Sequence, residues 1–441
     1  MKRRDFLGAA LATGLSGSIL SKEVASSRSV DSALGKVGGL SRGSLEGLLD
    51  DCRYQLFEGY LPFWENGGYD KEHGGFMCYL YDDGSVENER KDIWYQGRGI
   101  WVYSTIYNEF DADPKWLDRA RRSRDFMVEH MHSGDGAWLD TVDRVGRPVD
   151  GIAIDRSNNI YGALFAAVGL IQFAKATGSS EDLELAKLSL RKAVERYEDP
   201  KYLGVVAPGV NETGLRAQGH SFMMVWVIPQ LLEIQADPWF ETLAREHLDA
   251  LRTKFWNEEY GISNEMLFHD YLRIPSQAGK MIPGHSIEAQ WMCMEEALRI
   301  DDESMYRIFK DRMRRLIEMT WDYPFGGTCD TGYSVYPSKE RPAGPVLNEK
   351  TMWAQAEVSI GCLMAFEQTG EAWSSEWFER SWEYLQQTMV TDCGVWRQAV
   401  DRQGRDKQRE GISIYRRGNF HQPRCLMFLM RTLNRMIARS A

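Results

Sequence analysis

The residues from Ser157 to Tyr197 read SNNIYGALFAAVGLIQFAKATGSSEDLELAKLSLRKAVERY. Apolar residues recur at spacings of three and four through residues 157–177 and again through residues 180–197, which is typical of helices that bury one face. Because so few residues separate the two helices, they are expected to form a helical hairpin. This pair is the unit from which the fold is predicted.

The same pairing recurs along the rest of the chain. Twelve helices are predicted, at residues 44–64, 93–110, 115–132, 157–177, 180–197, 217–235, 238–255, 284–300, 303–321, 349–370, 373–390 and 421–438. Short strand-like segments lie between the pairs, and turn dipeptides such as Asp83-Gly84 favour β-hairpins there. These segments are residues 75–86, 137–149, 203–210, 262–274, 327–336 and 395–405.

A short internal repeat supports a regular architecture. Residues 142–147 read VDRVGR and residues 400–405 read VDRQGR, so five of the six positions agree. Six helical hairpins at even spacing are too regular for an open solenoid with distinct caps. We therefore predict an all-α fold, an (α/α)6 barrel of twelve helices with short β-hairpins in the loops on one rim. One domain is expected, over residues 44–441.

The composition excludes several classes of protein. With 43% hydrophobic and 12% aromatic residues among 441, the chain can build a large core and is neither disordered nor collagen-like. Its formal net charge of -11 argues against binding to nucleic acid. The seven cysteines include no close C-x-x-C pair. Reduced, buried thiols are therefore expected, not a zinc knuckle or a disulfide framework.

The N-terminal residues form a separate segment. The basic run Lys2-Arg3-Arg4 precedes an apolar, Gly- and Ala-rich stretch that ends at Leu20, which predicts a twin-arginine export signal over residues 1–27. The stretch is too short for a comfortable membrane span, so no stable span is expected after processing. Cleavage near Ala25 would release a periplasmic or extracellular protein. Residues 28–43 are rich in Ser and Gly and are expected to form a linker.

Two patterns that resemble known motifs are set aside. Residues 39–43 match the G-x-S-x-G nucleophile pattern but lie in the predicted linker, with no strand before them. His130, His132 and Asp135 could form a metal cluster, yet the histidines end a predicted helix, where imidazoles suit the carbonyl end. The sequence contains no P-loop, G-x-G-x-x-G or H-E-x-x-H pattern. Neither a metal nor a cofactor is expected.

At the starts of two predicted helices, a histidine has a charged residue three positions later on the same face: His285 with Glu288, and His421 with Arg424. The positive end of the helix dipole disfavours the imidazolium, so each histidine can remain a neutral base near neutral pH. A single histidine at a helix start is more often a cap or a packing residue. Two of them among only eight histidines suggest proton transfer.

A second group of residues suggests a binding cavity. Trp94, Arg98 and Trp101 share one helical stripe, and Trp353 and Glu357 lie together at a spacing of four. Aromatic residues at such spacing usually belong to a core. An arginine between two tryptophans cannot be buried without a partner, however, so a polar cavity with an aromatic floor is the alternative. Such a cavity suits a sugar, because its apolar faces pack on Trp and its hydroxyls bond to polar side chains.

These residues, together with others in the same order, resemble the N-acylglucosamine 2-epimerase family, which includes cellobiose 2-epimerases, mannose isomerases and the mammalian renin-binding protein. The likeness extends over residues 45–437. It is carried by Leu61-Pro62-Phe63-Trp64, Gly74-Gly75-Phe76, Trp94 to Trp101, Tyr161 to Phe165, Gly169-Leu170, Thr177-Gly178, Pro283-Gly284-His285 with Glu288, Lys350 with Trp353 and Glu357, and Phe420-His421-Pro423-Arg424. The resemblance implies the (α/α)6 barrel that the helix count also predicts.

The resemblance also implies roles for single residues. The catalytic residues would be His285 and His421 as the acid/base pair and Glu288 as a residue that orients them. The substrate-binding residues would be Arg98, His220, Trp94, Trp353, Glu357 and Arg424, of which Glu357 would also tune a histidine. The chain departs from the family in its predicted export signal and in lacking a glycine-rich nucleotide-effector loop. Both departures argue against N-acetylglucosamine as the substrate.

The expected reaction is proton transfer at C2 of an open-chain reducing sugar through an enediolate, which gives either a 2-epimer or a ketose. Two alternatives stay open. A glycoside hydrolase or lyase on the same barrel would use Glu288 and Glu357 as its carboxylates, and a noncatalytic member would only bind a carbohydrate or a protein. The expected partner is a small saccharide and not nucleic acid. A homodimer also remains open, since the sequence does not give the oligomeric state.

Overall fold

The computed structural model describes residues 42–149, 159–202, 204–207, 210–329, 332–337, 343–346, 349–406 and 417–439. The predicted export signal and nearly all of the predicted linker lie outside these residues.

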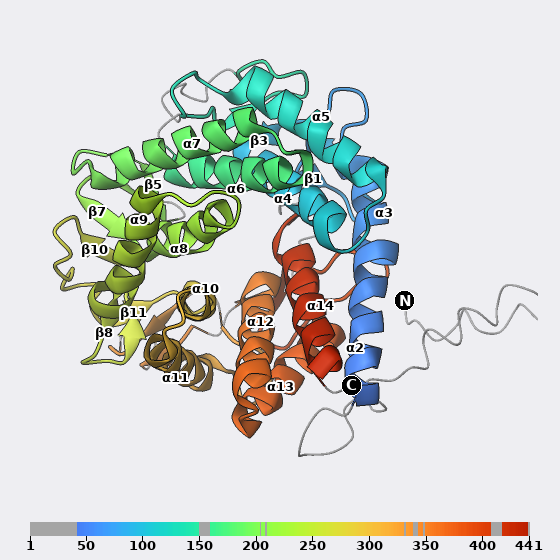
Figure 1. The fold of residues 1–441 in the computed structure, drawn as a ribbon. Helices are drawn as coiled ribbons and strands as arrows, with labels where there is room; N and C mark the ends of the chain where they lie inside the picture. The colour runs from blue at the N-terminus through green and yellow to red at the C-terminus, as the bar shows by residue number, and fades with distance from the viewer. Residues whose placement is uncertain are drawn as a thin grey trace, which may run out of the picture.

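Twelve helical segments form two concentric rings, as predicted (Figure 1). The inner ring consists of α4 (Ile93–Glu109), α6 (Ile160–Thr177), α8 (Gln218–Leu232), α10 (Pro283–Arg299), α12 (Met352–Thr369) and α14 (His421–Arg439). The outer ring consists of α2 (Arg42–Tyr54) with its continuations η2 (Gln55–Tyr60), α3 (Leu61–Phe63) and η3 (Trp64–Gly68), then α5 (Pro114–Met131), α7 (Ser180–Glu198), α9 (Pro238–Ala250) with η5 (Leu251–Phe255), α11 (Glu303–Thr320) and α13 (Ala372–Thr388). The barrel is therefore closed and helical.

Successive inner helices pack against each other, from α4 through α6, α8, α10 and α12 to α14. The last and first inner helices are joined by an ion pair of Arg431 with Glu109, in which Arg431 Nε lies 2.5 Å from a carboxylate oxygen. An inner helix that is covered on both sides needs no polar face, unlike an outer helix. In α6 every residue from Ile160 to Ala174 is buried.

Helix α6 is long and apolar enough to cross a membrane, with a mean hydropathy of 1.4. However, 83% of this helix is buried inside the protein. The same composition is expected of an inner helix, which must bury its whole circumference. The position of α6 in the ring therefore explains its composition.

Glycines allow α4 and α6 to approach closely. A Cβ atom on Gly97 of α4 would lie 2.1 Å from the carbonyl oxygen of Phe165, and one on Gly169 of α6 would lie 2.6 Å from the carbonyl oxygen of Gly97. Any side chain at either position would push the two backbones apart. The contact thus depends on the two glycines, which lie beside the cavity described below.

The connections differ in length at the two ends of the barrel. From α4 onward, short turns lead from each inner helix to the next outer helix, whereas long loops lead from each outer helix to the next inner helix. All six long loops therefore gather at the N-terminal ends of the inner helices. This confirms the prediction that the loops lie on one rim.

The long loops contain fifteen described strands of two to four residues: β1 (Tyr79–Leu80), β2 (Val86–Asn88), β3 (Lys91–Asp92), β4 (Thr141–Val142), β5 (Gly204–Ala207), β6 (Val210–Glu212), β7 (Leu215–Ala217), β8 (Trp256–Asn257), β9 (Ile262–Ser263), β10 (Met266–Phe268), β11 (Lys280–Met281), β12 (Tyr333–Ser334), β13 (Gly344–Pro345), β14 (Glu349–Thr351) and β15 (Ala399–Asp401).

Each long loop contains antiparallel pairing of its own, as predicted, because four loops pair two strands and single bridges join Val142 to Pro148 and Val400 to Asp406 in the other two. Strands β1 and β2, β5 and β6, β8 and β9, and β12 and β13 pair within one loop. Strands β3 and β4, β7 and β10, β11 and β12, and β14 and β15 instead join neighbouring loops. A strand directly before an inner helix pairs with the following loop, because the ring places those two segments side by side. This pairing ties the rim together.

The internal repeat extends further in three dimensions than in the sequence. Lys91 is fully buried, and its Nζ donates to Asp70 at 3.0 Å and to the carbonyl oxygen of Arg144 at 2.8 Å. Arg144 also donates to Asp70 at 3.0 Å. The carboxylate of Asp70 thus joins one cation from before α4 to one from the following loop.

An equivalent cluster lies at the start of α12. Lys350 Nζ lies 3.1 Å from Asp322 and donates to the carbonyl oxygen of Arg402 at 2.9 Å, and Arg402 donates to Asp322 at 2.9 Å. Both lysines stand three residues before a tryptophan of the cavity, in the segments KDIWYQGR (91–98) and KTMWAQAE (350–357). The two clusters therefore fix the starts of the two inner helices that flank α14.

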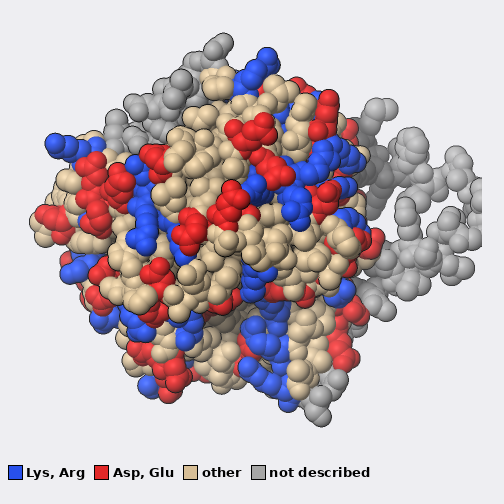
Figure 2. All heavy atoms as spheres, turned by 45° about the horizontal axis from the view of Figure 1, so that its top comes forward, with Lys and Arg blue, Asp and Glu red and all other residues tan. Residues whose placement is uncertain are grey.

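Charged side chains of both signs are interspersed over most of the surface seen in Figure 2.

Six of the seven cysteines are buried, and Cys393 is half-buried. All seven are free thiols, as predicted.

Candidate active site

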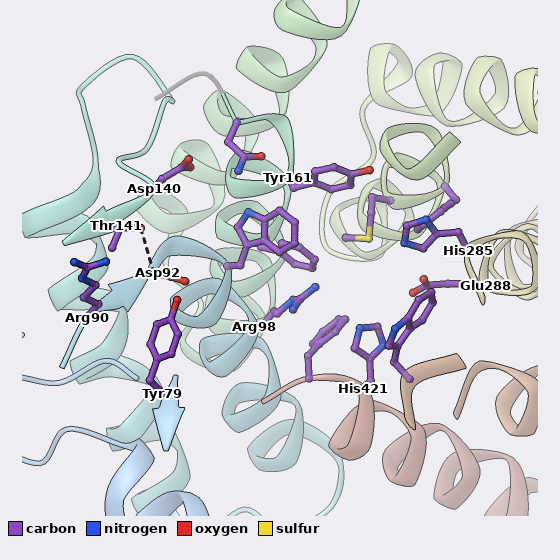
Figure 3. A pocket seen from close by; sticks show the side chains of 17 residues that line it. Tyr79, Arg90, Asp92, Arg98, Asp140, Thr141, Tyr161, His285, Glu288 and His421 are labelled. Atoms are coloured by element: carbon purple, nitrogen blue, oxygen red, sulfur yellow. Dashed lines mark hydrogen bonds between the residues drawn. The ribbon is translucent and has the colours of Figure 1, made fainter. Parts of the chain in front are cut away.

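The first turns of the inner helices surround a cavity of about 650 Å³ at the rim that carries the long loops (Figure 3). The lining residues come from all six inner helices and from the loops between them. They are Tyr79, Arg90, Asp92, Trp94, Arg98, Asp140, Thr141, Asn159, Tyr161, Phe165, Phe222, Met223, His285, Glu288, Trp353, Phe420 and His421.

His285 lines the cavity from the first turn of α10, which begins with Pro283. Its Nδ1 lies 2.9 Å from Oε1 of Glu265, which comes from the loop before α10. The other oxygen of Glu265 accepts a hydrogen bond from the side-chain amide of Gln218 at 2.8 Å. The carboxylate fixes the orientation of the imidazole, whose Nε2 is the nitrogen turned away from Glu265.

His421 is the first residue of α14 and lines the same cavity. Its Nδ1 lies 3.0 Å from Oε1 of Glu357, a fully buried residue on α12. The other oxygen of Glu357 accepts a hydrogen bond from the indole of Trp291 at 2.9 Å. Both histidines are therefore held through Nδ1 by a carboxylate from a different element.

The indole of Trp353 lies beside both imidazoles. Its ring centroid lies 5.1 Å from that of His285 and 5.6 Å from that of His421. Both histidines therefore adjoin one aromatic wall of the cavity. A small substrate on that wall would lie close to both imidazoles.

A buried guanidinium lies beneath His421. Arg424 Nη2 donates to Glu288 and to Glu357, both at 2.6 Å, and lies 3.2 Å from Nδ1 of His421. The donor atoms of Glu288, Glu357 and His421 lie within 4.8 Å of one another, as in a metal site. The guanidinium already supplies the cation around which they gather, so the donor set does not call for a metal ion.

Burial and Arg424 together keep His421 neutral. The loss of solvent lowers the pKa of His421 well below its usual range, and the positive charge of Arg424 lowers this pKa further. Burial raises the pKa of Glu357, which Arg424 opposes. A neutral imidazole is the form that can accept a proton.

Arg98 reaches the cavity from α4 and packs on aromatic rings. Its guanidinium carbon lies 4.0 Å from the ring centroid of Phe165, 4.9 Å from that of Phe420 and 5.2 Å from that of Trp94. In Figure 3 it extends between the aromatic rings toward the histidines. The cavity thus combines a cation with apolar walls, which is the alternative that the sequence left open for Trp94 and Arg98, whereas Trp101 is buried and does not line it.

Six of the nine predicted site residues line the cavity: Trp94, Arg98, His285, Glu288, Trp353 and His421. The placement of the other three as substrate contacts is corrected. Glu357 and Arg424 have no exposed surface, and His220 is 1% exposed. They lie one layer below the cavity, where they contact other side chains of the site.

His220 packs against the ring of Tyr161, with centroids 4.4 Å apart, and Tyr161 itself lines the cavity. Tyr161 was not predicted as a site residue, although it occupies the first turn of α6, as Trp94 does in α4. That equivalence could have identified it. Glu265 was also missed, because it lies in a loop without helical periodicity. Nothing local marks it as the partner of a histidine 20 residues later.

The geometry does not suit Glu288 and Glu357 as the carboxylates of a hydrolase. Both carboxylates accept a hydrogen bond from the same nitrogen of Arg424, and Glu357 is fully buried. Hydrolytic carboxylates must stand on opposite sides of a scissile bond, about 5 to 9 Å apart. A sugar has no room between these two.

Comparison with known proteins gives the family. The family model for N-acylglucosamine 2-epimerase (GlcNAc 2-epimerase) matches residues 74–414. The N-acylglucosamine 2-epimerase of Rattus norvegicus is 25% identical over 405 residues, which cover 87% of this chain and 92% of that protein.

Solved structures share the fold. A cellobiose 2-epimerase from Bacillus thermoamylovorans superposes with a TM-score of 0.73 at 19% identity, over 88% of this chain and all of that one. A D-mannose isomerase superposes with a TM-score of 0.70 at 16% identity, over 90% of this chain and 98% of that one.

Fold, cavity and likenesses together define an (α/α)6-barrel enzyme of the isomerase class that acts as a sugar epimerase or isomerase. The chain belongs to the N-acylglucosamine 2-epimerase family, whose model covers most of its length.

Proposed function

We propose that this enzyme interconverts reducing sugars by moving the C2 proton between two histidines, His285 and His421. The observation that supports this most directly is the pair of carboxylate-bound imidazoles that both lie beside Trp353 in one cavity. A two-base reaction at one carbon needs a base on one face and an acid on the other.

The sugar reacts in its open-chain form, because the C1 carbonyl makes the C2 proton acidic. One imidazole removes that proton through Nε2, and the electron pair passes to the C1 oxygen to give an enediolate. Arg98 is the cation placed to stabilise the developing negative charge. The second imidazole returns a proton to the opposite face of C2, which inverts that carbon.

Delivery of the proton to C1 instead of C2 would turn an aldose into a ketose. The two outcomes differ by about an ångström in the placement of the substrate. The cellobiose 2-epimerase and the mannose isomerase with this fold represent the two outcomes. We propose that the substrate is a reducing mono- or disaccharide.

The test is proton NMR in D2O with mannose, glucose, fructose, N-acetylmannosamine, cellobiose and mannobiose. We expect loss of the C2 proton signal for at least one sugar, with a new epimer or ketose. His285→Ala and His421→Ala should each lower the rate by a factor of about 10² to 10⁴, the usual contribution of an acid/base group.

His73→Ala is the matched control, since this histidine lies about one-third exposed outside the cavity and should keep full activity. Release of new reducing ends from oligosaccharides without exchange at C2 would support a hydrolase instead. Binding without turnover, unchanged in His421→Ala, would support a noncatalytic sugar-binding protein.

We also propose that the enzyme is exported by the twin-arginine route and acts outside the cytoplasm. The support is the Lys2-Arg3-Arg4 run before a short apolar stretch. Replacing Arg3 and Arg4 by lysine keeps the charge and should retain the protein in the cytoplasm, as measured by cell fractionation. Equal export of the wild type and the double variant would contradict the proposal, and mass spectrometry of the exported protein would locate the cleavage site.

A further inference from the structure

We propose that a second cavity, at the end of the barrel opposite the two histidines, binds a small organic cation. A primary ammonium group of this ligand would pair with Glu295, and its apolar body would pack against aromatic side chains. The inference goes beyond the proposed function, because it concerns a different site and a ligand of different chemistry.

The second cavity has a volume of about 310 Å³ and lies at the C-terminal ends of the inner helices. Glu109 and Arg299, the last residues of α4 and α10, line it, as does Lys175 in the last turn of α6. The cavity of the histidines lies instead at the N-terminal turns of the same helices. Because the carbonyl ends of helices carry partial negative charge, this end of the barrel favours a cation.

One layer of aromatic side chains separates the two cavities. Trp226 of α8 lines the second cavity, and its ring centroid lies 5.7 Å from that of Phe420, which lines the cavity of the histidines. Trp101 of α4 also lines the second cavity, and its ring centroid lies 5.4 Å from that of Phe420. A ligand in the second cavity would therefore lie behind the sugar site and would not displace a sugar.

Glu295 supplies the negative charge that a cation needs. It is half-buried, lines the second cavity from α10, and forms no hydrogen bond or ion pair with the residues that the structure describes. The other three glutamates that line this cavity each form an ion pair. The pairs are Glu109 with Arg431, Glu233 with Lys175, and Glu296 with Arg299. Glu295 is thus the carboxylate left for a ligand.

The arginines nearest in charge to Glu295 are held by other carboxylates. Arg431 donates two hydrogen bonds to Glu109, at 2.5 and 2.6 Å. Arg435 donates two hydrogen bonds to Glu367, both at 2.6 Å. Such two-bond pairs fix the guanidinium groups on their own partners. Neither arginine is therefore placed to pair with Glu295.

The balance of charge around the second cavity is negative. Its lining includes four cations and four glutamates, and Glu241 and Glu367 bind two of these cations from outside the lining. Four cations thus face six carboxylates among the described residues. Burial raises the pKa of Glu295 to about 7, so near neutral pH a bound cation would favour its ionised form.

The rest of the lining offers apolar surface more than free polar groups. Gln230 Oε1 accepts from the indole of Trp101 and from the side-chain amide of Gln172, both at 2.9 Å, and Gln230 Nε2 donates to the carbonyl oxygen of Trp226 at 3.0 Å. Trp101, Trp226 and Phe428 provide aromatic surface. Aromatic rings attract an ammonium group and also pack the apolar part of a small ligand.

The experiment uses three ligands of nearly the same shape and different charge: benzylamine, benzyl alcohol and benzoate. Calorimetric titration measures their affinity for the wild type at neutral pH. Benzylamine should bind with a Kd in about the millimolar range or below, and at least about tenfold more tightly than the alcohol. Equal binding of the amine and the alcohol, or tighter binding of benzoate, would overturn the proposal.

Glu295→Gln removes the charge and keeps the shape of the side chain. It should weaken the binding of benzylamine by at least about tenfold and leave that of benzyl alcohol unchanged. Glu303→Gln is the matched control, because Glu303 lies outside the cavity with a side chain that is 85% exposed. Equal affinity of the wild type and Glu295→Gln for benzylamine would show that the cation binds elsewhere.

The pH dependence of binding tests the wild type alone, so it does not depend on the folding of a variant. Benzylamine stays protonated between pH 8 and 5, whereas Glu295 takes up a proton as the pH falls through about 7. Affinity should therefore fall below pH 7, by up to about tenfold per pH unit. The other ionisable groups that face the cavity are Lys175, the three arginines and the ion-paired glutamates named above. Affinity that did not change with pH would overturn the proposal, whether or not a sugar substrate is found.

Discussion

The position of a single residue decides whether it can touch a sugar. His285 and His421 have a carboxylate behind Nδ1 and the cavity before them. Arg424 is as polar as either but lies entirely below the surface, between two carboxylates. Its positive charge acts on His421 and on the two buried carboxylates. Arg424 can exert this electrostatic effect without touching the substrate.

At this scale we predict that Arg424→Met destabilises the protein strongly. The change leaves Glu288 and Glu357 buried without their common cation, which should lower the free energy of unfolding by about 3–5 kcal/mol. Urea denaturation measures this change in the free energy of unfolding. Arg439→Met, in the same helix but largely exposed, should change the free energy of unfolding by less than about 0.5 kcal/mol. Equal effects of the two changes would show that the buried cluster is not needed for stability.

Among the helices, those of the inner ring carry the chemistry at their N-terminal turns. Every long loop leads into one of these turns, so loops can vary around a constant ring of helices. The equivalent segments 91–98 and 350–357 show how the same turn is used twice. Trp94 and Trp353 both line the cavity, whereas Arg98 reaches it and Glu357 supports a histidine.

The contact of α4 with α6 predicts opposite effects of the same substitution at two glycines. Gly97→Ala would place a Cβ 2.1 Å from a carbonyl oxygen of α6, so it should lower the free energy of unfolding by about 1–3 kcal/mol or more and displace Arg98. Gly47→Ala in α2 meets no atom within 4 Å and should stabilise the protein by up to about 1 kcal/mol. Thermal unfolding of both variants compares them, and a neutral Gly97→Ala would contradict the close contact.

The duplicated clusters at the starts of α4 and α12 predict equal losses of stability when either buried lysine is replaced. Lys91→Met and Lys350→Met each remove one of two cations from a buried aspartate, which keeps its bond to Arg144 or Arg402, so each should lower the free energy of unfolding by about 1–3 kcal/mol. Guanidinium denaturation tests this prediction. If either variant were as stable as the wild type, the prediction would be contradicted, because packing of the Met side chain would then replace the ion pair.

For the whole molecule, buried histidines make stability depend on pH. His247 is buried in α9, with Nδ1 3.2 Å from the hydroxyl of Ser221, and burial lowers its pKa from the usual 6.5 to about 4. Between these values the unfolded chain binds the proton and the native protein does not. Stability from this group is therefore present above pH 6.5 and is lost as the pH falls toward 4.

Between pH 6.5 and 4, His247 alone should lower the free energy of unfolding by up to about 3 kcal/mol, because a shift of one pKa unit corresponds to about 1.4 kcal/mol. His421, whose pKa is also lowered, adds to it in the same direction. His247→Gln should show a shallower fall of the melting temperature between pH 6.5 and 4 than the wild type does. His73→Gln, at the surface, should keep the wild-type slope. Parallel curves for all three proteins would contradict the role of His247.

The sequence by itself determined the helices, their pairing and the closed ring. Helical periodicity is a local property, with contacts three and four residues apart, so all twelve helices could be predicted within a few residues of their observed bounds. The same local spacing identified His285 with Glu288 and Trp353 with Glu357 as candidate site residues, because each pair lies on one helix face.

Only the tertiary structure decided which side chains meet across helices. Closure of the ring brings Glu265 to His285, and Arg424 to both Glu288 and Glu357. It also pairs strands of neighbouring loops, in addition to the hairpins predicted within each loop. Such contacts join residues far apart in the chain and leave no period in the sequence. Burial follows in the same way, because a residue lies on the cavity wall or one layer below it according to how the six inner helices pack together.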